Sequence, residues 1–219
     1  MCNLYSLRTS RAALARKFGL SDNRMAAFDP LPGIFPGYMA PVIRRTADHE
    51  RELVLLSRGF VLLQHGRAPK RVTNTRDDKV ATPFWKDSFE RRRCLVPASS
   101  YCEPKGEKPA TWHWFALKGG EPRPLFAFPG LWRTWHGPTR KNGPNITQEV
   151  FSFMTTLPNA LTTTVNDERM PVLLTEEAEL ETWLSGTPEE AFRLIRSLDA
   201  DAMHIVQSGF DKEDLLAIA

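Results

Sequence analysis

The sequence has few cysteines and no long apolar run. Its three cysteines, Cys2, Cys94 and Cys102, form no metal-ligand spacing, and an odd number cannot all pair, so we expect a protein of the reducing cytosol. The first twenty residues contain arginines but no apolar segment of signal-peptide length, and no later segment approaches the length of a membrane span. We therefore expect neither export nor membrane insertion, and no spacing implies a metal or nucleotide cofactor.

Internal repeats, low-complexity tracts and long linkers are also lacking. A chain of 219 residues is long enough to bury one full core, and 42% apolar with 25% charged residues is ordinary for a globular protein. We therefore predict a single domain over residues 1–219. The 17 prolines favour short strands and shaped loops over long helices.

Acidic residues are scarce in the first two thirds of the chain. Residues 1–150 contain 25 Lys and Arg but 13 Asp and Glu, whereas residues 151–219 contain 4 and 13. The small net charge of +3 hides this separation. A segregated positive region is typical of a protein that binds a polyanion such as nucleic acid; an acidic excess that only solvates C-terminal helices is the alternative.

The local patterns predict an α+β fold, with a curved, mostly antiparallel, barrel-like sheet and peripheral helices. Helices are expected over Ser10–Phe18 and over residues 175–186 and 187–198, the last with Thr187 as N-cap and a capping box. Residues 29–36 are so rich in Pro and Gly that they indicate an ordered loop. Short apolar or aromatic segments predict the strands: ELVLLSRGFVLL, CLVPA, TWHWFAL, PLFAFPGLW, VFSFMTT and AMHIV.

The N-terminus itself is a candidate site. A small second residue permits removal of Met1, and Cys2 would then carry an α-amine and a thiol on adjacent carbons, a 1,2-aminothiol. An α-amine has an ordinary pKa of about 7.7–8.0, against about 10.4 for lysine, so far more of it is neutral and nucleophilic at pH 7. The thiol, with a pKa of about 8.5, is activated further by nearby cations. The alternative is that the second position merely holds a small residue.

Three further stretches combine polar side chains with strand-like surroundings. KRVTNTRDD puts Asn74 and Arg76 on one face of an extended segment. Glu103 follows a strand and a turn in RCLVPASSYCEPKG, and residues 166–169 form a polar loop that leads back into the sheet at PVLL. Taken singly, each has a structural explanation, as a turn former, a solvated loop acid or a surface ion pair.

Together these stretches resemble the SOS response-associated peptidase (SRAP) family of abasic-site processing proteins. MCNLYS, NTR, CLVPASSYCEPK and TTLPNA…RMPVLL match the family's blocks in order, from Cys2 to about Val206. The resemblance implies an SRAP-like fold, a role in the DNA-damage (SOS) response and a covalent shield for abasic sites in single-stranded DNA. It also implies a cysteine proposed to remove its own N-terminal extension, which here would be Met1 alone.

The chemistry that the resemblance implies is a DNA–protein crosslink. The amine of Cys2 attacks the aldehyde of the ring-opened abasic deoxyribose to give an imine, and the thiol then closes a thiazolidine. Ring closure within one residue benefits from a high effective molarity, whereas a lysine can form only the reversible imine.

The resemblance also assigns roles to three other residues. Asn74 matches the asparagine that holds the terminal cysteine and the sugar in register, and Arg76 matches an arginine that contacts DNA phosphate. Glu103 matches the acid that protonates the ring oxygen and opens the sugar. Because such an acid must carry a proton near neutrality, we expect a sheltered, apolar setting and a raised pKa for Glu103.

The sequence departs from the family at one catalytic position. The loop before Met170 normally offers a histidine that shuttles protons, whereas this chain has Asn166 there, or Asp167 if the gap differs. Asparagine orients a water but does not titrate, so we expect Cys2 to crosslink with slower formation or slower reversal. His204, in the predicted C-terminal strand, is a candidate substitute; a structural histidine is the alternative.

The remaining prediction is a DNA surface, whose phosphate contacts would make binding salt-dependent and indifferent to base identity. Trp85 is included as a side chain that stacks on a base, with a core position as the alternative. The predicted DNA-contacting residues are Arg76, Arg71, Lys70, Arg67, Arg44, Arg45, Pro41, Trp85 and Arg169.

Two other functions fit parts of the sequence. An N-terminal-nucleophile thiol amidohydrolase also exposes a terminal cysteine, but such enzymes usually follow it with glycine and need a larger sheet sandwich. A non-catalytic single-strand-binding module would make Cys2 incidental. The expected partner is single-stranded DNA containing abasic sites, with replication-fork proteins as further candidates. We expect a cytoplasmic monomer, associated with the nucleoid when bound to DNA.

Overall fold

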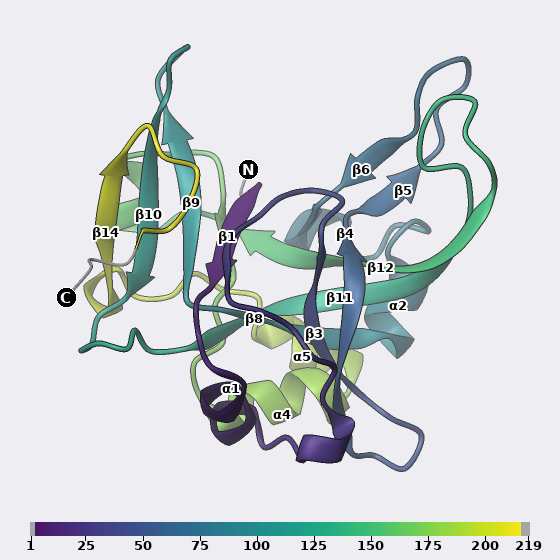
Figure 1. Ribbon diagram of the computed structural model, residues 1–219, viewed down its shortest axis with the longest axis horizontal. Coiled ribbons are helices and arrows are strands. Elements are labelled where there is room, and N and C mark those ends of the chain that lie inside the picture. Colours follow the sequence, from purple (N-terminus) through teal and green to yellow (C-terminus); the bar gives the residue numbers. More distant parts are fainter. Residues whose placement is uncertain (1–2, 216–219) are drawn as a thin grey trace.

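Strands account for most of the regular structure in the computed structural model, which describes residues 3–215 (Figure 1). Five strands close into a barrel in the order β11-β8-β3-β4-β12, because β12 pairs back with β11. All pairs in this ring are antiparallel except β12 with β4. The barrel strands are β3 (Met39–Arg45), β4 (Arg51–Arg58), β8 (Arg93–Ala98), β11 (Phe126–Gly137) and β12 (Ile146–Thr156).

A second, antiparallel sheet of five strands stands beside the barrel (Figure 1). Its order is β14 (Met203–Gly209), β10 (Thr111–Leu117), β9 (Ser100–Lys105), β1 (Leu4–Leu7) and β2 (Leu31–Ile34). Only Ser99 separates β8 from β9, so one continuous segment runs from the barrel into this sheet. The backbone N–H of Ser99 donates to the carbonyl of Ser6 over 2.9 Å, which holds β1 against the crossing.

Short elements complete the fold. Strands β7 (Asn74–Arg76) and β13 (Met170–Pro171) both pair with β12, and β5 (Phe60–Leu62) with β6 (Lys70–Val72) forms a separate hairpin. The helices are α1 (Arg11–Phe18), α2 (Lys86–Arg91), α3 (Ala160–Thr163), α4 (Glu177–Ser185) and α5 (Pro188–Arg193), with 3₁₀ turns η1 (Asp22–Arg24), η2 (Asp77–Lys79) and η3 (Ala200–Ala202). Within residues 3–215, no helix is long and apolar enough to cross a membrane.

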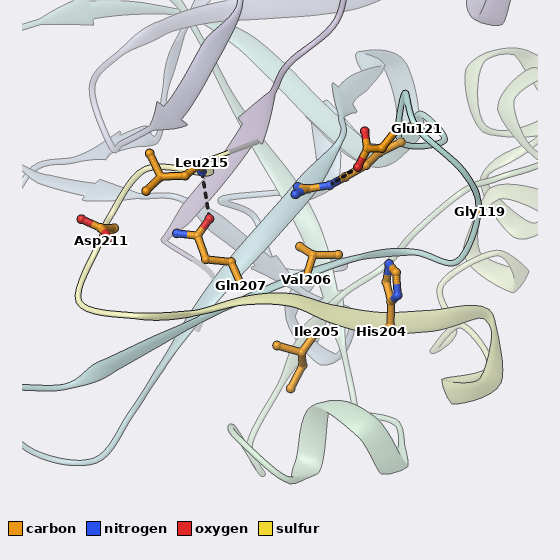
Figure 2. A pocket seen from close by; sticks show the side chains of 9 residues that line it. Gly119, Glu121, His204, Ile205, Val206, Gln207, Asp211 and Leu215 are labelled. Atoms are coloured by element: carbon orange, nitrogen blue, oxygen red, sulfur yellow. Dashed lines mark hydrogen bonds and ion pairs between the residues drawn. The ribbon is translucent and has the colours of Figure 1, made fainter. Parts of the chain in front are cut away.

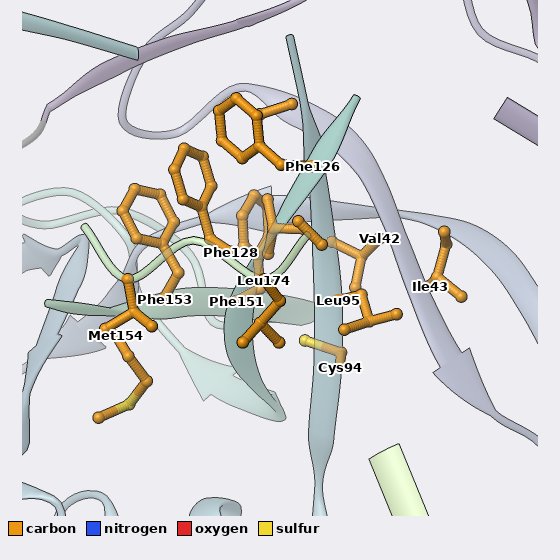
Figure 3. Packing of buried hydrophobic residues seen from close by; sticks show 14 of the residues in the cluster. Val42, Ile43, Cys94, Leu95, Phe126, Phe128, Phe151, Phe153, Met154 and Leu174 are labelled. Carbon is orange, nitrogen blue, oxygen red and sulfur yellow. The ribbon is translucent and has the colours of Figure 1, made fainter. Parts of the chain in front are cut away.

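Aromatic side chains fill the barrel (Figure 3). Phe126 and Phe128 of β11, and Phe151 and Phe153 of β12, are spaced two residues apart and are fully buried. The rings of Phe128 and Phe153 stack with centroids 4.4 Å apart. Burial of each such side chain stabilises the fold by on the order of 1.5–3 kcal/mol, so this interior holds the strands that carry the site.

The predicted α+β, barrel-like fold is confirmed. Helix α1 begins after Ser10, whose side chain caps it, and ends at Gly19 with a φ of 61°. Helix α5 has the predicted capping box of Thr187 and Glu190 but ends at Arg193, five residues earlier than predicted. The predicted loop over residues 29–36 is wrong, because it contains β2. Proline is tolerated there since β2 is an edge strand, paired on one side only with β1.

Candidate functional site

The start of β1 lies beside the end of β9. Leu4 pairs with Cys102 and Tyr5 with Tyr101, so the register brings Asn3 next to Glu103, one step beyond the last pair. Glu103 is in β9 and is fully buried. Segments a hundred residues apart in the sequence therefore meet where the second sheet adjoins the barrel (Figure 1).

The environment of Glu103 favours its protonated form. Burial raises the pKa of Glu103 to about 7, although the nearby Asn166 amide and Arg58 guanidinium partly oppose this by stabilising the carboxylate. A carboxyl with this pKa donates a proton at neutral pH, which an exposed glutamate does not.

Asn166 is the loop residue that reaches Glu103. Its Nδ2 donates to Oε2 of Glu103 over 3.0 Å, and its Oδ1 accepts the backbone N–H of Glu168, also over 3.0 Å. These two bonds fix the orientation of the amide. Asp167, the alternative position for the family histidine, is exposed, and no hydrogen bond joins it to Glu103.

Arg58 holds the N-terminal segment through a hydrogen bond to Asn3, and it is not among the site residues predicted from the sequence. Its guanidinium is fully buried at the end of β4, with its Cζ 4.8 Å from the ring centroid of Tyr5 and 5.1 Å from that of Phe153. It donates to the backbone carbonyls of Asn3, over 2.9 Å, and Ile34. The sequence signal for a site residue was weak, because an arginine before Gly59 in an apolar stretch fits an exposed strand end as well as a buried site.

A pocket of about 400 Å³ opens beside Asn3. Thr73 donates its hydroxyl to Oδ1 of Asn3 over 2.9 Å. Asn74 is 6% exposed, and neither Oδ1 nor Nδ2 of its side chain has a hydrogen-bond partner among residues 3–215. Buried amide groups are nearly always bonded, so this one is available to a group that enters the pocket. The lining residues are Asn3, Pro36, Lys70, Arg71, Val72, Thr73 and Asn74.

Cys2, the predicted nucleophile, lies outside the described residues. The two internal cysteines are both buried in the interior. Burial raises the pKa of the Cys94 thiol strongly, which keeps it protonated and inert. Among the described residues, no group of three or more His, Cys, Asp or Glu side chains could hold a metal ion.

Some predicted DNA-contacting residues lie at this pocket. Lys70 and Arg71 line it, and Arg67 is exposed in the turn of the same β5–β6 hairpin. Arg71 also donates to Oγ of Ser57 over 3.0 Å, and burial lowers the pKa of its guanidinium. Arg76 lies at the far end of β7, where it forms two 2.8 Å bonds with the carboxylate of Asp78.

The other predicted DNA-contacting residues are buried or paired within the fold. Arg44 pairs with Glu52 and Glu149, Arg45 with Glu181, and Arg169 with Asp77. Pro41 is buried in the middle of β3. Trp85 is 6% exposed and stacks on Phe60 with ring centroids 4.8 Å apart, so it is a core residue without a face for a base. We leave these five residues out of the interface.

His204 does not reach Glu103. It lies on β14, two strands away, and lines a different pocket of about 550 Å³ together with Glu121 and Arg123 (Figure 2). The histidine that shares the Glu103 side of the sheet is His113, which pairs with Glu103 across β9 and β10. Its Nδ1 is 2.8 Å from Oγ of Ser208, and burial lowers its pKa. The sequence alone could not reveal this pairing, since it depends on register.

Comparison with known proteins identifies the family and the fold. A profile of the SOS response associated peptidase (SRAP) family matches residues 1–208. Abasic site processing protein YoqW, from Bacillus subtilis strain 168 and from Bacillus phage SPbeta, is 35% identical over 128 residues, which cover 57% of this chain and 54% of that protein. Abasic site processing protein YobE of B. subtilis is 31% identical over 141 residues, covering 63% and 61%. The chain thus spans between half and two thirds of these relatives.

Solved structures share the fold. A protein from Bordetella bronchiseptica has a TM-score of 0.74 at 19% identity, covering 94% of this chain and all of that one. A protein from Bacteroides thetaiotaomicron has a TM-score of 0.70 at 20% identity, covering 94% and 92%. At this identity the likeness concerns the fold alone.

Proposed function

Because this chain belongs to the SOS response associated peptidase (SRAP) family, we propose that it binds abasic sites in single-stranded DNA and crosslinks to them through Cys2. The relatives YoqW and YobE, named as abasic site processing proteins, support the choice of lesion. The observation that carries the proposal is the carboxyl of Glu103, fully buried, with its pKa raised to about 7 and next to the N-terminal segment.

The proposed reaction needs Met1 to be absent, so that Cys2 has a free amine. The protonated carboxyl of Glu103 gives its proton to the ring oxygen of the abasic sugar, the bond from that oxygen to C1′ breaks, and the C1′ hydroxyl returns a proton to the carboxylate as it becomes the aldehyde. The amine adds to C1′, and loss of one water leaves the imine. The thiol sulfur then bonds to C1′ while its proton passes to the nitrogen, which closes the thiazolidine with one water lost overall.

Neighbouring residues have positioning roles in this proposal. The buried amide of Asn74 hydrogen-bonds the sugar or the terminal amine, and Asn166 keeps one oxygen of Glu103 fixed. Arg58 and Thr73 hold Asn3, and with it the direction from which the chain enters the site. Lys70 and Arg71 face the phosphates that flank the lesion.

The test is intact-mass analysis after incubation with single-stranded DNA bearing one abasic site. We expect the mass of the protein without Met1, plus the DNA, minus one water. Cys2→Ala and Cys2→Ser each keep a free α-amine but lose the thiol, so both should give only an imine that appears after borohydride reduction. Cys94→Ala is the control and should crosslink normally. Retention of Met1, or an adduct of Cys2→Ala that is stable without borohydride, overturns the proposal.

The pH dependence provides a second test. The reaction needs Glu103 protonated, with its pKa at about 7, and the α-amine neutral, with a pKa of about 7.7–8.0. The formation rate should therefore peak at about pH 7.4 and fall on both sides. Glu103→Gln should slow formation by roughly 10²–10⁴-fold and remove the decrease at high pH. A variant that keeps that decrease would contradict the role of Glu103.

A further inference from the structure

Two hairpins that contain no acidic residue lie side by side (Figure 1). Residues 53–76 include hairpin β5–β6, residues 122–148 include the turn between β11 and β12, and neither range has an Asp or Glu. Arg133 of β11 fastens them together, since its Nη2 donates to the carbonyl of Val61 over 3.1 Å and its Cζ lies 4.3 Å from the ring centroid of Phe60. The second hairpin is not among the predicted DNA contacts.

The turn from β11 to β12 presents two cations to solvent. The backbone N–H of Gly143 donates to the carbonyl of Arg140 over 3.1 Å, and Asn142 is left-handed with a φ of 56°. A Cβ on Gly143 would lie 2.6 Å from Cγ of Arg140, so a larger residue at this position would displace the Arg140 side chain. This tight turn leaves Arg140 and Lys141 exposed at its end.

These cations differ from most arginines of the barrel, because no side-chain partner for them is found in the described part of the chain. Within residues 3–215, the side chains of Arg67, Lys70, Arg140 and Lys141 make no hydrogen bond or ion pair. By contrast, Arg44 and Arg51 each pair with two glutamates. Exposed like charges without acids nearby repel one another and create a positive potential that attracts a polyanion.

The ladder register gives the distance from the site to the turn. Phe153 of β12 pairs with Asn74 of the pocket, and Ile146, seven residues earlier, pairs with Gly137 at the turn. At about 3.4 Å per residue, the turn begins roughly 24 Å along the curved strand from Phe153, and Lys141 lies four residues beyond Gly137, at most roughly 14 Å farther. A stacked strand rises about 3.4 Å per nucleotide, so the total of at most roughly 38 Å corresponds to about eleven nucleotides, and to fewer if the strand is extended.

We propose that the β11–β12 turn is a second DNA-binding arm, in which Arg140 and Lys141 contact backbone phosphates up to about eleven nucleotides to one side of the abasic site. This rests on the proposed function, because the lesion defines where the strand starts. The contacts go to phosphate, so they add affinity without base preference. DNA is bound asymmetrically, with a longer footprint on the side of the arm.

The test compares Arg140→Gln/Lys141→Gln with the charge-matched control Arg16→Gln/Lys118→Gln. All four side chains are exposed, and none makes an ion pair within the described part of the chain, so both variants should fold. Arg16 is in α1 and Lys118 follows β10, away from both hairpins (Figure 1). The probe is a seven-nucleotide strand with a central tetrahydrofuran abasic analogue, which has no aldehyde and so reports binding alone.

The strand is then extended by ten nucleotides on either the 5′ side or the 3′ side, and each extension is tested both as a single strand and as a duplex. The extension on one of the two sides should strengthen binding by the unaltered protein and by the control variant, but not by Arg140→Gln/Lys141→Gln, the arm variant. The slope of log affinity against log salt should be shallower by about 1.4 for the arm variant on the extended single strand, the value for two contacts. Whether the single-stranded or the duplex extension gives the larger gain in affinity identifies the kind of DNA that the arm binds.

Equal binding of short and extended strands, or an arm variant that keeps the whole gain, would overturn the arm. Intact-mass analysis of crosslinking to a seven-nucleotide strand with a true abasic site separates the two proposals. An adduct without an extension effect removes only the arm. The absence of any adduct removes the proposed function, on which the position of the lesion depends.

Discussion

At the scale of single residues, the buried carboxyl that we propose as the catalytic acid, Glu103, also lowers the stability of the protein when it is ionised. Its pKa is about 7 in the folded protein and close to 4.5 when exposed, so the folded state binds the proton more tightly. The folding stability associated with this carboxyl is therefore fully present below pH 4.5 and is lost as the pH rises through 7. Glutamine at this position carries no such pH dependence.

Glu103→Gln should consequently stabilise the protein at high pH. The pKa difference of Glu103 lowers the free energy of unfolding of the unaltered protein by about 3 kcal/mol above pH 7. Glu103→Gln removes this loss, so its Tm should be higher by roughly 5–10 °C at pH 8 and unchanged at pH 4. Thermal unfolding followed by circular dichroism at both pH values measures this. Glu107→Gln, in the exposed turn after β9, is the matched control and should change neither Tm. Equal Tm values of Glu103→Gln and the unaltered protein at pH 8 would show that burial does not raise the pKa of Glu103.

Asn166 offers a second test at this scale. Its amide bonds Glu103 but does not titrate, whereas an imidazole with an ordinary pKa of about 6.5 exchanges protons at neutral pH. Asn166→His should therefore speed both formation and reversal of the crosslink, by roughly 10-fold or more. Single-turnover formation and release into excess competitor DNA measure the two rates. Unchanged rates, with Asp167→His as the comparison, would show that position 166 takes no part in proton transfer.

At the scale of elements, the C-terminal segment fastens the strand that begins at the site. Asp214 is fully buried and accepts hydrogen bonds from Ser6 of β1, over 2.7 Å, and Ser100 of β9, over 2.6 Å. It also pairs with Arg123 over 2.7 Å, and its backbone N–H donates to the carbonyl of Pro32 in β2. One residue, through its carboxylate and its backbone N–H, thus joins three neighbouring strands of the second sheet to the chain after β14.

Asp214→Ala should lower the stability strongly. It leaves the largely buried guanidinium of Arg123 without its closer acid, a change that typically costs about 3–5 kcal/mol. Tm should fall by roughly 6 °C or more, whereas Asp211→Ala, an exposed neighbour, should leave it unchanged. Differential scanning calorimetry of both variants decides. If Asp214→Ala melts like the unaltered protein, the segment does not hold the sheet.

At the scale of the whole molecule, the positive charge of residues 1–150 divides into two classes. Arg44 is held by Glu52 and Glu149, and its Cζ lies 4.3 Å from the ring centroid of Trp132, so its charge belongs to the fold. Arg67 and Lys70 have no such partners in the described structure, and their charge is available to DNA. The sequence count of cations does not separate these classes.

Substitution of a paired cation should change stability but not DNA binding, and substitution of the unpaired cations should change DNA binding but not stability. Arg44→Gln should lower Tm and leave affinity for abasic-analogue DNA unchanged. Arg67→Gln/Lys70→Gln should leave Tm unchanged and make the salt dependence of binding shallower by about 1.4. Calorimetry and fluorescence anisotropy on the same preparations give both quantities. A loss of DNA affinity in Arg44→Gln without a change in Tm would contradict the division.

Local sequence determined the helices and most strands of this protein, because capping residues and short apolar segments act on their immediate neighbours. It also determined the separation of charge along the chain and, through four short blocks, the family to which the chain belongs. Asn74, Glu103 and Asn166 could be named as site candidates in advance, since each stands in such a block.

Tertiary structure alone decided which of these side chains meet and which charges are free. The burial of Glu103, the bond from Asn166 to it, and Arg58 beneath Asn3 all arise from segments tens of residues apart. The ion pairs of Arg44 and Arg45, the core position of Trp85 and the edge strand at Leu31–Ile34 have the same origin. The desolvation of a side chain and its ion pairs depend on the residues that pack against it in space, and these residues are distant from it in the sequence.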